Sequence, residues 1–179
     1  MPPPTPDEIS KLPHRDKDAV LTLYAHYFLA AELMLKNYKK LVGKCDRSEK
    51  VTANDRVQLP IYLFTWLGFL GVTAEGFKDL GIRKLVQDAR PAEFAKLLPD
   101  AGAVGKLLKK HDDALRRVRN TVFHLRKNTE DVEHFFYERR GRLEWAEELQ
   151  VAFGTFFSGY RILCQVYYAI GDRDDEMFK

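Results

Sequence analysis

The chain has 179 residues, of which 45% are hydrophobic and 31% are charged, and its formal net charge is +3. This length allows one domain with a full hydrophobic core and is too short for two comfortable ones. The composition excludes disordered and fibrous proteins, and the modest charge permits a nucleic-acid partner without arguing for one.

The ends of the chain differ from its middle in composition. Residues 1–15 are rich in proline and predict an extended arm, residues 16–171 predict a single helical-bundle domain, and residues 172–179 predict a charged, frayed tail. The first residues contain neither an apolar core nor a cleavage site, so we expect no signal peptide.

Two cysteines, Cys45 and Cys164, lie far apart and form no Cys-x-x-Cys pair. Their number and spacing argue against a zinc site and against a disulfide framework. We expect two reduced thiols in a cytoplasmic protein, with Cys164 buried among its apolar neighbours Ile162, Leu163 and Val166.

The first helix is predicted over residues 16–42, where apolar residues recur every three or four positions. Asp16 is its expected N-cap and Gly43 its expected stop. The polar, charged stretch Gly43–Asp55 that follows is predicted to be a loop.

A second helix is predicted from about Val57 to just before Gly81, with Pro60 in its first turn. Within it, Leu59–Ala74 carries no charge, but this stretch is shorter than the roughly 20 residues that a membrane span needs. We therefore predict a buried helix and no membrane contact. Gly68 and Gly71 are expected to let another helix approach closely.

Residues 82–98 predict two short helical pieces broken at Pro91, and Pro99, Gly102 and Gly105 mark a connection. Long helices are then predicted over 105–127 and 143–170. The aromatic segment 128–141 between them fits either a short strand pair or a loop whose aromatic side chains plug the end of the bundle. Together these elements predict an all-α, up-and-down bundle of four to five helices, with an irregular or β-hairpin insertion near 130–142.

The helix predicted over 105–127 carries the most informative polar residues, Arg119, Asn120 and His124. Asn120 and His124 are four residues apart and are predicted to share a helical face. Arg119 lies about 140° around the helix from His124, and a long arginine side chain can reach around the helix toward the histidine.

These three residue types suit phosphodiester chemistry. Histidine can take up or release a proton near neutral pH, and arginine stabilises the charge that builds on a phosphate in the transition state. Asparagine can orient the imidazole or bind a phosphate without adding charge. We therefore predict Arg119, Asn120 and His124 as catalytic residues.

Positive charge is concentrated around this motif. Residues 106–142 contain eleven Lys and Arg against six Asp and Glu, a net charge of +5 in a chain of +3. Such a surface favours phosphate binding. We expect Arg117, Arg126 and Lys127 to contact RNA, and we assign Arg116 to a helix ion pair with Asp112.

The segment Arg119-Asn120-Thr-Val-Phe-His124 resembles the signature of the HEPN superfamily (higher eukaryotes and prokaryotes nucleotide-binding). In that family an Arg is followed by a polar residue, often Asn, and four to six residues separate the Arg from a His on a late helix of a small bundle. Here four residues separate Arg119 from His124. Some members also carry an acidic residue on an earlier helix, for which Glu32 and Glu75 are candidates here.

The resemblance implies a HEPN-like bundle and a metal-independent endoribonuclease that leaves a cyclic phosphate and a 5′-hydroxyl. It also implies a homodimer whose two motifs face a shared cleft, a role as a toxin or in phage defence, and an antitoxin partner. No metal-ligand spacing such as His-x-x-x-His occurs, so we assign no metal and no cofactor. The alternatives are a HEPN-like module that binds RNA or nucleotide or a partner protein without catalysis, and a helical adaptor.

Overall fold

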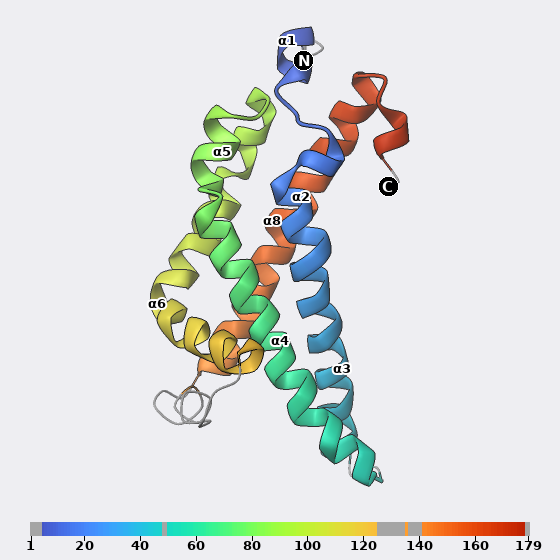
Figure 1. Ribbon diagram of the computed structural model, residues 1–179, viewed down its shortest axis with the longest axis vertical. Helices are drawn as coiled ribbons and strands as arrows, with labels where there is room; N and C mark the ends of the chain where they lie inside the picture. Colours follow the sequence, from blue (N-terminus) through green and yellow to red (C-terminus); the bar gives the residue numbers. More distant parts are fainter. Residues whose placement is uncertain (1–4, 48–49, 125–134, 136–140, 178–179) are drawn as a thin grey trace.

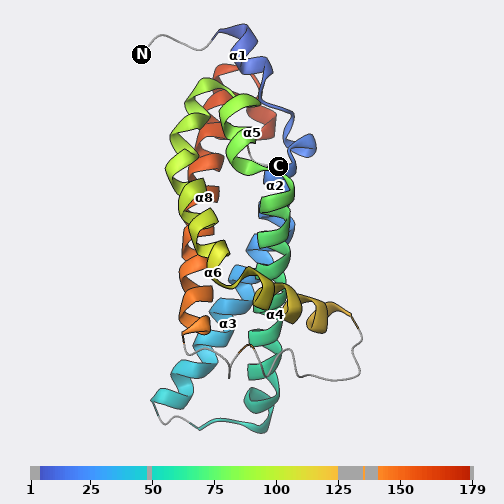
Figure 2. The same ribbon diagram turned by 90° about the vertical axis from the view of Figure 1, so that its left-hand side faces the viewer.

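The computed structural model describes residues 5–47, 50–124, 135 and 141–177. These residues form helices and turns with no strand among them, so the all-α prediction is confirmed. Four long helical segments run alternately up and down the bundle (Figures 1 and 2). The first consists of α2 (Ala19–Leu23), the π-helical η2 (Tyr24–Phe28) and α3 (Leu29–Asp46), and the others are α4 (Ala53–Asp79), α6 (Leu98–Phe123) and α8 (Arg142–Ile170).

The first segment begins later than predicted because its N-cap is Asp18 and not Asp16. The Asp18 carboxylate accepts a hydrogen bond from the Val20 N–H at 2.9 Å, while Asp16 lies in the preceding 3₁₀ turn η1 (Arg15–Lys17). The helix also continues through Gly43 to Asp46. A glycine inside a helix weakens it but does not have to end it.

A capping box sets the start of α4 and corrects two predictions. The Thr52 hydroxyl accepts a hydrogen bond from the Asp55 N–H at 3.1 Å, and the Asp55 carboxylate accepts one from the Thr52 N–H at 3.0 Å. The helix therefore starts at Ala53, so the predicted loop Gly43–Asp55 is helical at both of its ends. Pro60 consequently lies inside α4 and not in its first turn.

Among the described residues, α4 is also the helix that is long and apolar enough to cross a membrane. In its most apolar window 39% of the residues are buried inside the bundle. Trp66, Leu67 and Leu70 are fully buried there. The absence of membrane contact remains a prediction.

The two short pieces predicted on either side of Pro91 are present as α5 (Ile82–Asp88) and η3 (Ala92–Leu97). The connection predicted at residues 99–105 is wrong, because α6 already begins at Leu98. Pro99 occupies its first turn, where the missing N–H costs no helical hydrogen bond. The backbone of α6 leaves the helical conformation at His111 (φ −145°, ψ 24°), and the helix bends there (Figure 2).

The last helix is predicted almost to the residue, since α8 spans Arg142–Ile170. It supplies much of an aromatic core, with Phe153, Phe156 and Phe157 almost fully buried. Cys164 is buried as predicted, and burial raises the pKa of its thiol. The prediction that Cys164 is buried among Ile162, Leu163 and Val166 is wrong, because Ile162 and Val166 are exposed to solvent.

The insertion predicted near 130–142 lies mostly outside the described residues. Of its aromatic residues the structure describes Phe135, which is 1% exposed and belongs to the core. The Phe135 carbonyl accepts a hydrogen bond from Arg142 Nη1 at 3.2 Å. The choice between a strand pair and a loop therefore stays open.

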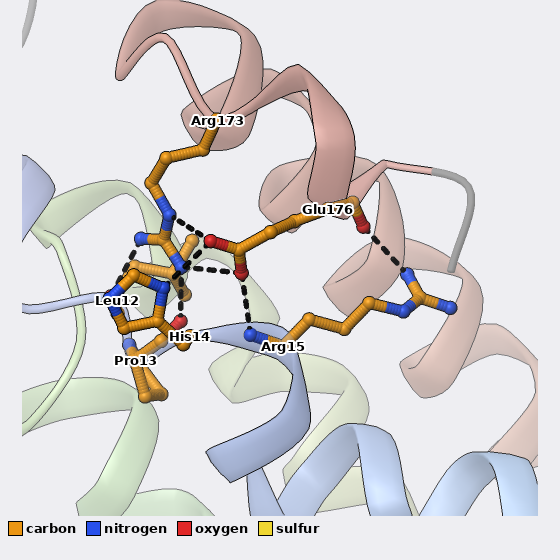
Figure 3. Close-up of polar contacts among 6 residues, drawn as sticks. All are labelled: Leu12, Pro13, His14, Arg15, Arg173 and Glu176. Carbon is orange, nitrogen blue, oxygen red and sulfur yellow. Dashed lines mark hydrogen bonds and ion pairs between the residues drawn. The ribbon is translucent and has the colours of Figure 1, made fainter.

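The two ends of the described chain are joined at one end of the bundle. The stretch predicted as an extended arm contains a short helix, α1 (Pro6–Ser10), and the predicted frayed tail contains the 3₁₀ helix η4 (Asp174–Glu176). Figure 3 shows the Glu176 carboxylate accepting hydrogen bonds from Arg173 at 2.8 Å and from the Arg15 N–H at 2.7 Å, with His14 Nδ1 at 2.7 Å. These contacts order the tail, so its predicted fraying is wrong for residues 172–177.

The Glu176 contacts predict a pH-dependent contribution to stability. Hydrogen bonds from Arg173, and then from the Arg15 N–H and His14, hold the pKa of Glu176 well below its usual range. We expect Glu176→Gln to lower the free energy of unfolding by about 1–2 kcal/mol at pH 7. Because the native pKa is depressed, this difference should be constant above about pH 5 and shrink as the pH falls below about 4.

Urea unfolding of both proteins at pH 7, 5 and 3.5 measures this difference. Asp174→Asn is the matched control, since it removes an exposed carboxylate from the same turn. A Glu176→Gln effect of equal size at all three pH values would show that the carboxylate charge does not contribute.

Candidate functional site

The C-terminal half of α6 is placed against α4 by two glycines. A Cβ atom at Gly68 would lie 2.9 Å from the Phe123 ring, and one at Gly71 would lie 2.8 Å from the Arg119 Cβ. Real Cβ atoms do not approach other atoms so closely, so a side chain at Gly71 would push α6 away from α4, and one at Gly68 would displace the Phe123 ring. The predicted close approach of a helix at Gly68 and Gly71 is confirmed, and the approaching helix carries the motif.

Arg119 lies between α6 and α4 and is held by an ion pair. Its Nη2 donates a hydrogen bond to Glu75 Oε1 at 2.7 Å, and its side chain is 19% exposed. Its Nε is buried and has no hydrogen-bond partner. The guanidinium is therefore fixed by one contact and retains donors for a further acceptor.

Glu75 is one of the two acidic candidates named from the sequence. The other, Glu32, is exposed on α3. The structure thus brings Glu75, and not Glu32, to the motif arginine.

His124 is not on the same helical face as Asn120, and that prediction is wrong. α6 ends at Phe123, and His124 is its C-cap with an extended backbone (φ −125°, ψ 137°). The two residues are joined through the backbone, where the His124 N–H donates to the Asn120 carbonyl at 3.0 Å. Within the described residues no hydrogen bond joins the side chains of Arg119, Asn120 and His124.

The predicted phosphate contacts are only partly described. Arg117 is exposed on α6, while Arg126 and Lys127 lie outside the described residues. The ion pair predicted between Arg116 and Asp112 is wrong, because Arg116 pairs with Asp113 at 3.3 Å and Asp112 pairs with Lys78 of α4. The remaining cations of this part of α6 are exposed at positions 106, 109 and 110.

In the part of the chain that the structure describes, no group of three or more His, Cys, Asp or Glu side chains is arranged to hold a metal ion. The assignment of no metal remains a prediction.

Sequence reasoning missed a cavity of about 860 Å³ between the C-terminal end of α4, α5 and α6. Arg117 lines it, but Arg119, Asn120 and His124 do not. Its walls combine residues from 77–84 at the junction of α4 and α5, residues from 101–117 of α6, Phe135, and Arg142 of α8. These segments are distant in the sequence, so no local sequence pattern predicts the cavity.

The site can therefore offer a fixed, partly buried guanidinium, an exposed imidazole a few residues away, and a cationic helix surface. No family model, no curated protein and no solved structure matches this chain.

Proposed function

We propose that this protein is a HEPN-like, metal-independent endoribonuclease that acts as a homodimer in the cytoplasm. The observation that carries the proposal is the ion pair between Arg119 and Glu75. It joins the motif arginine to an acidic residue of an earlier helix, the kind of residue that some members of the family carry. It also holds the guanidinium in place before substrate arrives, which is how an arginine best stabilises a transition state.

Each motif residue has a role in the proposed reaction. The RNA 2′-hydroxyl oxygen attacks the adjacent phosphorus and gives its proton to an imidazole, while the bond from phosphorus to the 5′-oxygen breaks and that oxygen takes up a proton. The products are a 2′,3′-cyclic phosphate and a 5′-hydroxyl. Arg119 binds the phosphate oxygens, His124 transfers protons, and Asn120 orients the imidazole or the phosphate.

The reaction needs a base and an acid, and each chain supplies one motif histidine. A second copy related by a two-fold axis would supply the other. Because His124 lies just beyond α6, the helix does not fix its imidazole. We propose that bound RNA and the second protomer do so, since catalytic hydrogen bonds often tighten only in the complex.

The surface of α6 supports the choice of RNA as substrate. Exposed Lys109, Lys110 and Arg117 lie on the helix that carries the motif. Neutralising phosphates with such cations releases counterions, so binding should weaken steeply with salt. A role as a toxin or in phage defence, restrained by an antitoxin protein, is proposed from the HEPN resemblance alone.

The proposal is tested by cleavage of a mixed pool of structured and single-stranded RNAs in EDTA. We expect products with 2′,3′-cyclic phosphate ends, and a rate about 10²–10³-fold lower for Arg119→Ala. Arg116→Ala is the matched control, because it removes the same charge from the same helix at a residue paired with exposed Asp113. Circular dichroism checks that each variant is folded, and absence of cleavage by the wild type would contradict the proposal.

A second function, RNA binding without cleavage, is favoured by one observation. Within the described residues no side chain orients the His124 imidazole. A binding module needs no such orientation. This function predicts salt-dependent retention of intact RNA and no product in the same assay.

A further inference from the structure

The cavity between α4, α5 and α6 has an apolar interior. Figure 1 shows α6 bowing away from α4 beside α5 before it returns to cross α4. The floor of the cavity is formed by Phe77, Ile82, Leu108 and Phe135, each at most 5% exposed. Its volume of about 860 Å³ is that of a site for a small organic molecule.

The rim of the cavity is cationic. Arg83 and Lys84 of α5 and Lys109, Lys110 and Arg117 of α6 line it, and all five are exposed. None of the five has an ion-pair partner among the described residues. The two acidic residues of the lining, Asp112 and Asp113, are already paired with Lys78 and Arg116.

Nothing in the described residues requires glycine at position 105. It lies inside α6, where glycine is less stable than other residues, yet an added Cβ would meet no atom within 4 Å. Gly105 lines the cavity, so a side chain there would project into space that is open in this structure. Gly102 has equally open surroundings in the same helix but does not line the cavity, which makes it a matched control.

We propose that this cavity binds a small amphiphilic anion. The apolar body of the ligand lies against the floor, and its phosphate, sulfonate or carboxylate group is held by the cations of the rim. An apolar interior with a few charged groups at its edge is the arrangement that recognises such molecules. The cavity does not include Arg119, Asn120 or His124, but its rim shares Lys109, Lys110 and Arg117 with the surface proposed to bind RNA. The inference does not depend on the proposed function.

The test is a fluorescence titration of the full chain with 8-anilinonaphthalene-1-sulfonate, an aromatic anion. We expect Gly105→Leu to raise the dissociation constant at least tenfold and Gly102→Leu to leave it within twofold. The double variant Lys84→Gln/Lys109→Gln should also weaken binding and reduce its dependence on salt. Thermal unfolding of each variant checks that the bundle is intact.

Competition then identifies the body of the ligand. Displacement of the probe by dodecyl phosphate alone assigns an acyl body, and displacement by ATP alone assigns a nucleotide body. The proposal is overturned if neither displaces the probe, if the wild type does not bind the probe, or if the two leucine variants behave alike. RNA cleavage by Gly105→Leu reports separately on the proposed function.

Discussion

Replacing Asp18 with alanine is expected to lower the free energy of unfolding by about 3–5 kcal/mol. The Asp18 carboxylate is fully buried and accepts hydrogen bonds from Arg90 Nη2 at 3.1 Å and from the Tyr160 hydroxyl at 2.7 Å. The Arg90 side chain is only 9% exposed. Alanine would therefore leave a buried guanidinium without its countercharge, and it would also remove the N-cap of α2.

Tyr160 adds to the expected cost of losing Asp18. Burial, and then the Asp18 charge, raise the pKa of Tyr160, so its hydroxyl stays protonated and donates to the carboxylate. Arg90 Nε also donates to the Tyr160 oxygen at 2.6 Å. Loss of Asp18 would leave the Tyr160 proton without an acceptor in a buried site.

Urea unfolding followed by circular dichroism measures the effect, with Asp16→Ala as the matched control. Asp16 is exposed two residues earlier and should change stability by less than about 0.5 kcal/mol. The double variant Asp18→Asn/Arg90→Met should cost less than the sum of its two single variants, since both charges leave together. Equal effects of Asp18→Ala and Asp16→Ala would rule out the buried network as a source of stability.

The positions of the long helices and one close helix contact could be predicted from the sequence alone. The spacing of apolar residues predicted the bounds of α8 to within one residue, and Pro91 predicted the break between α5 and η3. Both predictions rest on patterns of neighbouring residues. Gly68 and Gly71 indicated a close helix contact, because glycines inside an apolar helix have few other uses.

Helix ends were predicted less well because single hydrogen bonds decide them. Asp16 was predicted as the cap of the first segment, but the cap is Asp18, whose carboxylate is buried beside Arg90. The ordered tail depends on contacts of Glu176 with His14 and Arg15, which are more than 150 residues away. No local pattern contains such information.

The residues of the candidate site were named from the sequence, but their arrangement in space was not predicted. Arg119 and Glu75 were both named, and their pairing follows from the packing of α6 on α4. His124 was placed on a helical face because the pattern does not show that α6 ends one residue earlier. The cavity was missed because its walls meet only in the folded bundle.

His124→Ala is expected to lower the rate of RNA cleavage by about 10³-fold while leaving the helical circular dichroism unchanged. Under the proposed reaction the imidazole moves the protons that both bond-forming and bond-breaking steps require. The side chain is exposed beyond the end of α6, so its loss should not disturb packing. His26→Ala is the matched control, since His26 is an exposed histidine in η2.

The proposed homodimer gives this experiment a second readout. If each active site uses the histidines of two protomers, the specific activity of the wild type should rise with protein concentration until the dimer is saturated. His124→Ala should dimerise normally, as measured by light scattering, and still fail to cleave. Cleavage by His124→Ala at the wild-type rate would exclude the histidine from the reaction. The Arg119–Glu75 pair would then be explained by packing, and salt-dependent RNA binding would be the function left to test.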